Sequence, residues 1–307
     1  MANLRPLRNK VLIVGANGLL GQKLVKAFSK NFALTGTGRK RDPILANKDF
    51  QYRPCDMTKR SELRSLVHEV EPNTIINAAA YTNVDGCEDN KEECWRVNVT
   101  GVEYLAQAAR SVDAFLVHIS TDYVFDGKAG GYSETSTPSP ISYYGRAKLA
   151  SENAVLAAGI EHAIVRTMIL YGVGHQVGPN FATWLAQKLS AGDPVQIVDD
   201  QFGHPTLVDD LALAIRRIAE LRKDGCYHIA GVECVSRHYF AVQLAKVFGF
   251  DQNLITRIKT SDLHQKAPRP LNSSFNLEKS RQKLGIELSG IEKGLTVFKE
   301  QFQNSNL

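Results

Sequence analysis

Residues 10–21 read Lys10-Val11-Leu12-Ile13-Val14-Gly15-Ala16-Asn17-Gly18-Leu19-Leu20-Gly21. The apolar, β-branched run at the start predicts a buried strand, and the glycines that follow allow a tight turn and a close approach of the backbone. A helix beginning at Leu19 would direct its free N–H groups toward a phosphate. A strand, a glycine turn and a helix in this order predict the first unit of a dinucleotide-binding fold.

The alternation of strand and helix continues along the chain. Apolar β-branched runs alternate with amphipathic stretches through the first half, which predicts repeated βαβ units on a parallel sheet. Thr58 is the predicted N-cap of the second helix. We expect strands at 10–14, 32–36, 50–53, 73–78, 114–119 and 162–167, and helices at 19–30, 59–70, 89–111 and 142–158.

Beyond residue 170, glycine- and proline-rich turns separate the predicted elements. They are helices at 180–191, 206–222, 237–248 and 290–302, and short strands at 195–198 and 226–229. The predicted fold class is therefore α/β, a Rossmann-type doubly wound parallel sheet with a smaller C-terminal α/β substrate lobe. The predicted domains are a dinucleotide-binding Rossmann domain at 1–170, to which 206–230 return, and a substrate-binding lobe at 171–205 and 231–307.

The composition is that of an ordinary globular protein, with 307 residues, 43% of them hydrophobic, and a net charge of +5. No basic stripe with interleaved aromatic residues is present, so nucleic-acid binding is not expected. The N-terminus has no apolar signal core and no run approaches the ~20 apolar residues of a membrane span, so we expect no membrane association and a cytoplasmic location. The five cysteines form no Cys-x-x-Cys pair and His118, His175 and His204 are dispersed, so we expect reduced cysteines and no metal site.

The residues after the second predicted strand bear on the choice of nicotinamide cofactor. An NAD enzyme usually places an acid there for the ribose 2′-hydroxyl, whereas this chain has Arg39-Lys40-Arg41. Cations, and the planar fork of arginine above all, suit a 2′-phosphate, so we expect NADPH, with NADH as a weaker alternative. The small side chains of Ala78, Ala79 and Ala80 would let a cofactor approach the backbone. A solvated basic loop and a tightly packed strand end are the alternative interpretations.

Tyr144 and Lys148 stand four residues apart in the predicted helix 142–158 and therefore on one helical face. A cation held close to the phenol favours the phenolate and would lower the tyrosine pKa from its ordinary value of about 10. Ser120 and Thr121 follow the fifth predicted strand, at the sheet edge where open α/β folds bind ligands. This Ser/Thr-Tyr-Lys constellation predicts proton exchange with a carbonyl or alcohol oxygen.

The glycine spacing resembles that of the extended short-chain dehydrogenase/reductase family. Five motifs, in order and over nearly the whole chain, resemble its dTDP-4-dehydrorhamnose reductase branch; they lie at 77–85, 120–125, 144–150, 200–206 and 269–273. The resemblance implies transfer of a hydride from NADPH to the C4 ketone of a nucleotide-linked 6-deoxy sugar, most specifically dTDP-4-dehydrorhamnose, giving dTDP-L-rhamnose. It also implies that Tyr144 donates the proton, that Lys148 holds the nicotinamide ribose, and that Thr121 polarises the carbonyl.

The resemblance and the motifs together define the predicted site. Asp56 and Met57 resemble the family's adenine-contacting pair, and Arg269 is expected to meet the diphosphate. The predicted cofactor-binding residues are Gly15, Asn17, Gly18, Leu19, Gly21, Arg39, Lys40, Asp56, Met57, Ala78, Ala79, Ala80, Tyr144, Lys148 and Thr167. The predicted substrate-binding residues are Val84, Asp85, Thr121, Asp122, Tyr123, Ile169, Asn180, Gln201, Phe202 and Arg269.

One position departs from the reductase pattern and keeps alternatives open. The reductases carry a tryptophan that packs on the sugar where this chain has Ile169, so the sugar is undetermined. A second hypothesis is a non-catalytic NADP-binding subunit resembling the regulatory subunit of methionine adenosyltransferase, and a third is an epimerase-type enzyme, against which Arg39-Lys40-Arg41 argues. Dehydratases need a carboxylate where Tyr123 stands, so dehydration is not expected. We expect a nucleotide-sugar substrate and a monomer or homodimer.

Overall fold

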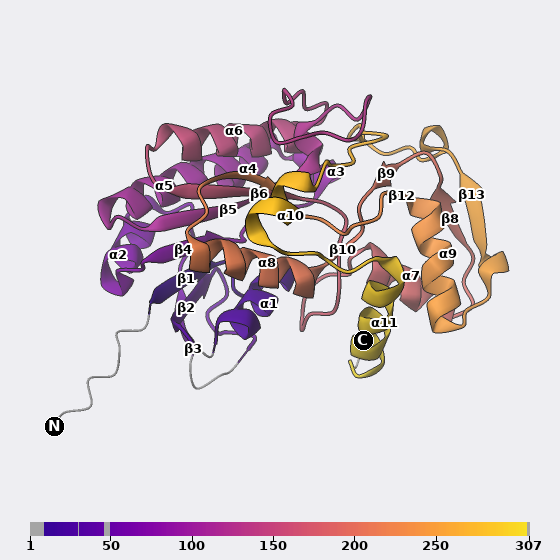
Figure 1. Ribbon diagram of the computed structural model, residues 1–307, viewed down its shortest axis with the longest axis horizontal. Coiled ribbons are helices and arrows are strands. Elements are labelled where there is room, and N and C mark those ends of the chain that lie inside the picture. The colour runs from indigo at the N-terminus through magenta and orange to yellow at the C-terminus, as the bar shows by residue number, and fades with distance from the viewer. Residues whose placement is uncertain (1–8, 30, 46–49, 306–307) are drawn as a thin grey trace.

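The computed structural model describes residues 9–29, 31–45 and 50–305. Its centre is a seven-stranded sheet with the strand order β11-β6-β5-β4-β1-β2-β3, and every neighbouring pair is parallel (Figure 1). The chain order reverses between β1 and β4, where the carboxyl ends of strands leave a crevice for a ligand. The strands are β1 (Lys10–Val14), β2 (Ala33–Gly38), β3 (Phe50–Pro54), β4 (Thr74–Asn77), β5 (Phe115–Thr121), β6 (His162–Thr167) and β11 (Gly225–His228).

Helices cover both faces of this sheet because side chains along a strand alternate between its faces. Val11 and Ile13 pack on α1 (Leu19–Phe28), α8 (Val208–Leu221) and α10 (Glu278–Leu284). Leu12 and Val14 point the other way, onto α2 (Arg60–Val70), α5 (Gly101–Ser111) and α6 (Tyr143–Ala157). The sheet is thus buried between two helical layers, as its almost continuous apolar strands predict.

A second apolar core lies beside the sheet, at the right of Figure 1. It is formed by α7 (Phe181–Ser190), α9 (Arg237–Phe248), α11 (Ile291–Gln303) and β8 (Val195–Val198), which pairs in parallel with β13 (Ile255–Ile258). Short strand pairs connect it to the sheet domain: β7 (Leu170–Tyr171) with β10 (Thr206–Leu207), and β9 (Phe202–Gly203) with β12 (Val235–Ser236).

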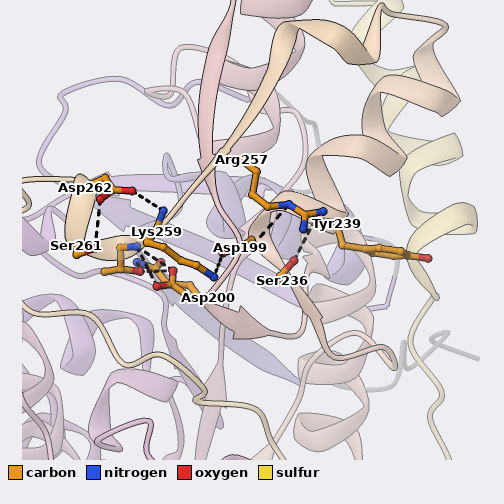
Figure 2. A network of polar contacts seen from close by, with 10 residues as sticks. Asp199, Asp200, Ser236, Tyr239, Arg257, Lys259, Ser261 and Asp262 are labelled. Atoms are coloured by element: carbon orange, nitrogen blue, oxygen red, sulfur yellow. Dashed lines mark hydrogen bonds and ion pairs between the residues drawn. The ribbon is translucent and has the colours of Figure 1, made fainter.

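Polar contacts fix the end of β8 against the segment after β13 (Figure 2). Lys259 Nζ donates to Asp199 Oδ1 at 2.8 Å, and Thr260 Oγ1 donates to Asp200 Oδ1 at 2.6 Å. Thr260 Oγ1 also accepts a hydrogen bond from Gln201 Nε2 at 3.2 Å. The network therefore holds the chain that leads into the predicted substrate segment 200–206.

A buried lysine joins three helices that are far apart in sequence. Lys23 on α1 is 5% exposed, and its Nζ donates to Asp209 Oδ1 on α8 at 2.9 Å and to Gln301 Oε1 on α11 at 3.0 Å. A buried ammonium needs such partners to balance the loss of hydration. The last helix of the chain is therefore attached to the helix that follows the glycine turn.

The predicted single helix at 89–111 is wrong, because Asn90 interrupts it. The structure has α3 (Val84–Asp89), α4 (Lys91–Trp95), a π-helical turn η1 (Arg96–Thr100) and then α5. Asn90 has a non-helical φ of −125°, and its side chain accepts Glu93 N–H at 3.1 Å, so it ends one helix and caps the next. The predictions also omitted α10 and β13.

The predicted N-cap at Thr58 is also wrong. α2 begins one residue later than expected, with Lys59 at the N-cap position and no side-chain cap. The Thr58 hydroxyl instead donates to Asp56 Oδ1 at 2.9 Å and accepts from Arg96 at 2.8 Å. The strand β11 lies in the main sheet beside β6, but the exact domain limits stay a prediction. Residue 30, the last of the expected first helix, lies outside the described residues.

Candidate active site

A cavity of about 290 Å³ lies at the carboxyl ends of β1, β2, β3 and β4. Ten of the predicted cofactor-binding residues line it: Gly15, Asn17, Gly18, Arg39, Lys40, Asp56, Met57, Ala78, Ala79 and Ala80. Six further residues complete the lining: Val14, Gly38, Cys55, Thr58, Val97 and Gln176. We call this cavity the first pocket. Val97 lies on the unpredicted π-helical turn η1, so no sequence motif indicated it.

The glycine turn shapes this pocket through close backbone contacts. Gly15 has φ +86°, and a Cβ there would lie 2.8 Å from Ala79 N, so only glycine fits. A Cβ at Gly21 would lie 2.1 Å from Gly15 O, so Gly21 lets α1 pack on the turn. Gly21 and Leu19, two further predicted cofactor-binding residues, do not line the pocket, and their role stays a prediction. Asn17 holds the loop after β2, donating to Asp42 O at 3.1 Å and accepting Ile44 N–H at 2.9 Å.

The outer wall of the first pocket carries charge. The Arg39 side chain is 70% exposed and its guanidinium lies 3.8 Å from Glu93, a long surface ion pair that leaves it free to move. Burial disfavours the Asp56 carboxylate, but hydrogen bonds from Thr58 and the cations Arg96 and Arg39 outweigh burial and lower its pKa. The exposed cations Arg39 and Lys40 and one ionised carboxylate therefore border the cavity.

The three predicted catalytic residues lie together beyond the first pocket. Thr121 ends β5, while Tyr144 and Lys148 share the buried face of α6 and are 9% and 2% exposed. Thr121 is hydrogen-bonded to Tyr144, and Lys148 Nζ donates to Ile119 O at 2.7 Å. The Ser120 hydroxyl instead donates to Glu152, one turn after Lys148 on α6, at 2.5 Å. The alternation of side chains along β5 therefore separates Thr121 from Ser120.

The expected lowering of the tyrosine pKa is wrong for this structure. Burial, followed by the charge of Asp122 and the phenol of Tyr123, raises the pKa of Tyr144, and the hydrogen bond with Thr121 opposes them only in part. Burial also lowers the pKa of Lys148 to about 8. Tyr144 therefore keeps its proton at neutral pH, which suits a proton donor, and the amine of Lys148 titrates much closer to neutrality than an exposed lysine.

Asp122 and Tyr123 form the turn η2 (Asp122–Val124) beside this group. Burial raises the pKa of Asp122 to about 6, although Ser273 Oγ donates to Oδ2 at 2.5 Å and Thr121 Oγ1 donates to Oδ1 at 3.0 Å. The ring of Tyr123 meets that of Tyr144 edge-on, with 5.7 Å between centroids. Asp122 thus connects Thr121, one of the predicted catalytic residues, to Ser273 in the C-terminal segment.

A second cavity, of about 390 Å³, opens beside Tyr123, and we call it the second pocket. Of the predicted substrate residues, Tyr123, Gln201 and Arg269 line it. The residues that sequence reasoning missed are Phe181, Trp184, Gln196, Ile197, Val198, Arg237, Leu263 and Gln265. They come from α7, β8, α9 and the segment after η4 (Thr260–Asp262).

Two arginines of the second pocket differ in their partners. Arg269 makes a bidentate pair with Asp85, at 2.6 Å to Oδ1 and 2.8 Å to Oδ2. Arg237 lies over the Phe181 ring, 5.2 Å from its centroid, and the described part of the chain offers its guanidinium no hydrogen bond or ion pair. The helical position of Arg237, directly after the N-cap Ser236, gave no sequence signal for a pocket residue.

Seven predicted substrate residues do not line the second pocket: Val84, Asp85, Thr121, Asp122, Ile169, Asn180 and Phe202. Ile169 has φ +46°, an unfavourable conformation for a β-branched residue, and a Cβ added at Gly203 would lie 2.9 Å from its Cδ1. Asn180 caps α7, and its Nδ2 donates to Gly172 O at 2.7 Å. Phe202 is 42% exposed on β9. That these residues contact a ligand stays a prediction.

Two buried threonine hydroxyls of the described sheet lack a partner, that of Thr37 on β2 and that of Thr167 on β6. The Thr167 hydroxyl, at the end of β6, is buried without a hydrogen bond, and a buried hydroxyl without a partner is unfavourable. A hydrogen-bonding ligand at the carboxyl edge of the sheet would satisfy it. Together with a cavity lined by glycine and alanine backbone, this group fits a bound dinucleotide.

Other kinds of site receive no support from the described residues. Among residues 9–29, 31–45 and 50–305, no group of three or more His, Cys, Asp or Glu side chains could hold a metal ion. All five cysteines are free. In the part of the chain that the structure covers, no helix has the length and apolar character needed to cross a bilayer.

A family model described as RmlD substrate binding domain matches residues 9–304. The chain belongs to this family. It is 35% identical over 298 residues to a dTDP-4-dehydrorhamnose reductase of Aggregatibacter actinomycetemcomitans, covering 93% of this chain and 97% of that one. It is also 32% identical over 284 residues to methionine adenosyltransferase 2 subunit beta of Xenopus tropicalis, covering 90% and 83%.

Solved structures of the RmlD family agree with the sequence relatives. A dTDP-4-dehydrorhamnose reductase from Bacillus anthracis in complex with NADP superimposes with a TM-score of 0.83 at 30% identity, covering 97% of this chain and 100% of that one. These comparisons confirm the predicted family, the Rossmann-type fold and the prediction of an NADPH-dependent oxidoreductase. The individual residue roles stay a prediction.

Proposed function

We propose that this chain reduces a nucleotide-linked 4-keto-6-deoxy sugar with NADPH, and that its substrate is dTDP-4-dehydrorhamnose, which becomes dTDP-L-rhamnose. The observation that carries the proposal is the buried group of Thr121, Tyr144 and Lys148 at the carboxyl edge of the sheet. The second pocket adjoins this group at Tyr123, and the first pocket lies at the ends of the neighbouring strands.

The first pocket supplies the residues that would hold the cofactor. Gly15 and Gly18 bring the backbone and the N-terminus of α1 to the pyrophosphate, and Arg39 and Lys40 meet the 2′-phosphate. The Thr167 hydroxyl finds a partner on the same ligand. When bound, NADPH supplies the hydride.

The chain's own residues handle the proton and the developing charge. Tyr144 holds its proton at neutral pH because burial raises its pKa, and it donates that proton to the oxygen at C4. The Thr121 hydroxyl turns from Asp122 to donate a hydrogen bond to the same oxygen and stabilises its negative charge. Lys148, within the same buried face of α6, holds the ribose and supports the tyrosine.

The second pocket supports a nucleotide-linked substrate. We assign the diphosphate to Arg237, because its guanidinium has no acceptor in the described residues, whereas Asp85 neutralises Arg269. The rings of Phe181 and Trp184 are stacked, 6.0 Å apart, and offer an aromatic surface for the base. This assignment revises the expectation that Arg269 meets the diphosphate.

The proposal is tested by incubating the purified protein with NADPH and dTDP-4-dehydrorhamnose, beside a panel of other nucleotide-linked 4-keto sugars. We expect loss of NADPH absorbance matched one to one by dTDP-rhamnose. Tyr144→Phe is the control, because it keeps the ring and removes only the transferable proton, and its turnover should fall roughly 10²–10⁴-fold. Absence of turnover on every sugar, with wild-type protein that binds NADPH, would overturn the proposal.

The regulatory-subunit hypothesis keeps one specific observation in its favour. Ile169 stands where the reductases have tryptophan, and its side chain packs beside Gly203 and away from the second pocket. On that hypothesis the protein would bind NADPH, turn over no sugar and form a complex with a methionine adenosyltransferase. Arg39 and Lys40 continue to disfavour an epimerase that retains NAD. A cytoplasmic location and a monomeric or homodimeric state stay predictions.

A further inference from the structure

A chain of hydrogen bonds runs behind the proposed catalytic residues. Asn77, at the end of β4, accepts Ala79 N–H on its Oδ1 at 3.2 Å, and its Nδ2 lies 3.1 Å from His118 Nδ1. His118 Nε2 lies 2.9 Å from Ser151 Oγ, and Ser151 Oγ donates to Lys148 O at 2.6 Å. The chain therefore connects Ala79, a wall of the first pocket, to the residue that carries the proposed catalytic amine.

Each bond of this chain has a fixed direction, and together they determine the tautomer of His118. Because Oδ1 of Asn77 accepts the Ala79 N–H, its Nδ2 faces the imidazole as a donor. Nδ1 of His118 must then be the unprotonated nitrogen, and Nε2 carries the hydrogen. The hydroxyl of Ser151 gives its own hydrogen to the backbone, so it accepts from Nε2.

The protonated Nε2 also faces the amine of Lys148, 3.3 Å from Nζ, so its single hydrogen lies between two acceptor positions, the Ser151 hydroxyl and this amine. An ammonium and an N–H group are both donors, so they make no hydrogen bond with each other. A neutral amine has a lone pair that can accept the N–H. His118 is fully buried, and burial, followed by the charge of Lys148, holds its pKa well below the ordinary value, so the ring stays neutral.

We propose that His118 is a positioning residue, which presents an Nε2–H to Lys148 and thereby stabilises the neutral form of that amine next to Tyr144. This function needs the ring to be held from both sides, by Asn77 and by Ser151. The inference rests on the proposed reductase function only for its purpose: an amine that is neutral at rest can take up a proton from solvent and pass it to Tyr144 after each turnover.

Other ionisable groups around Lys148 do not supply this effect. Glu152, one turn later on α6, favours the ammonium, but Arg166 neutralises it through two hydrogen bonds of 2.9 and 2.7 Å. Cys94 of α4 also favours the ammonium. Burial is the largest cause of the lowered pKa of Lys148. In our proposal, the Nε2–H of His118, 3.3 Å from the amine, acts in the same direction.

The tautomer is tested directly by nitrogen NMR of the histidine rings in the wild-type protein. His118 should show a protonated Nε2, an unprotonated Nδ1 and no titration between pH 5 and 9, a range of about two units on either side of neutrality. The other buried histidines provide an internal control: His204 Nδ1 lies 2.8 Å from Gly231 O and His228 Nδ1 lies 3.0 Å from Tyr132 O, so both must be protonated at Nδ1. An Nδ1-protonated or charged His118 would overturn the proposal.

The effect on Lys148 is tested by following its side-chain ¹³Cε shift with pH. His118→Met keeps an apolar body without the N–H, so the pKa of Lys148 should rise by at least about half a unit. His118→Gln retains a donor within reach of Ser151, so it should raise the pKa of Lys148 less than His118→Met does. His228→Met is the matched control, because His228 is also buried but does not contact Lys148. An unchanged pKa in His118→Met contradicts the proposal, and neither readout depends on turnover.

Discussion

Arg39 and Lys40 are the side chains on which cofactor choice depends at the scale of single residues. They follow β2 and line the first pocket, where an NAD enzyme would place a carboxylate. Among the described residues, Arg39 makes one ion pair, a long one with Glu93 at the surface, so its side chain can turn toward a phosphate. The neighbouring Arg41 does not line the pocket.

Replacing Arg39 and Lys40 together with alanine should therefore weaken NADPH binding by on the order of 1–3 kcal/mol for each charge-assisted hydrogen bond to the phosphate that the change removes. NADH binding should barely change, because NADH has no 2′-phosphate. Titration of both cofactors against the double variant measures the difference, and Arg41→Ala is the matched control. An equal weakening for the two cofactors would exclude a 2′-phosphate role.

Ten residues of the first pocket could be predicted because they follow strands, and the carboxyl ends of parallel strands meet at one edge. The second pocket could not be predicted in the same way. Asp85 and Arg269 are separated by 184 residues, and nothing in either motif shows that they pair with each other. In the sequence, Arg237 is an ordinary residue of the first turn of a helix. Only the packing of α9 against α7 brings it into the second pocket.

At the scale of elements, the glycine turn and α1 depend on each other. An alanine inside a helix is normally favoured over glycine by about 1 kcal/mol. At Gly21 this gain is outweighed, because the new Cβ would lie 2.1 Å from a backbone oxygen of the turn, which cannot move without distorting the first pocket.

Gly21→Ala should consequently lower the free energy of unfolding by about 1–3 kcal/mol, as overpacking does elsewhere, and weaken NADPH binding. Denaturant unfolding and cofactor titration measure the two effects. Gly178→Ala is the control, since no atom lies within 4 Å of its added Cβ, and its stability should be unchanged or slightly higher. Normal stability and affinity in Gly21→Ala would show that the turn can relax.

The helices of the sheet domain could be predicted from amphipathic periodicity, because one face of each packs on the sheet. Periodicity did not predict the helix boundaries where polar side chains determine the backbone conformation. Asn83 and Asn90 each cap a short helix, and Asn98 binds Tyr81 through both N–H and C=O, at 2.8 and 3.0 Å, within the π-helical turn. Such local bonds compete with a continuous helix and leave no apolar pattern.

At the scale of the whole molecule, Asp122 makes stability depend on pH. Its pKa is raised to about 6 in the folded state, above the unfolded value of 3.8, so the folded protein binds the proton more tightly. Below pH 3.8 the carboxyl is protonated in both states and therefore does not lower the free energy of unfolding. Its unfavourable effect grows as the pH rises from 3.8 to 6 and is complete above that range.

Asp122→Asn should remove this effect, because an amide stays neutral and the hydroxyls of Thr121 and Ser273 can each donate or accept. The free energy of unfolding should match that of the wild type near pH 4 and exceed it by on the order of 2–3 kcal/mol at pH 7. Denaturant unfolding across this range measures the difference. Asp193→Asn, at an exposed ion pair with Lys188, is the control and should stay within about 0.5 kcal/mol throughout. A difference that does not vary with pH would contradict the assignment.

The contact of Lys23 with Asp209 and Gln301 also has a consequence for how the protein is made. During synthesis, α1 leaves the ribosome long before α8 and α11, so the Lys23 ammonium has neither of its partners while the first strands are assembling. Burying an unpaired ammonium is strongly unfavourable, and α1 must therefore stay partly hydrated in the nascent chain. The contacts of Lys23 are complete only once residues 209 and 301 have both been synthesised.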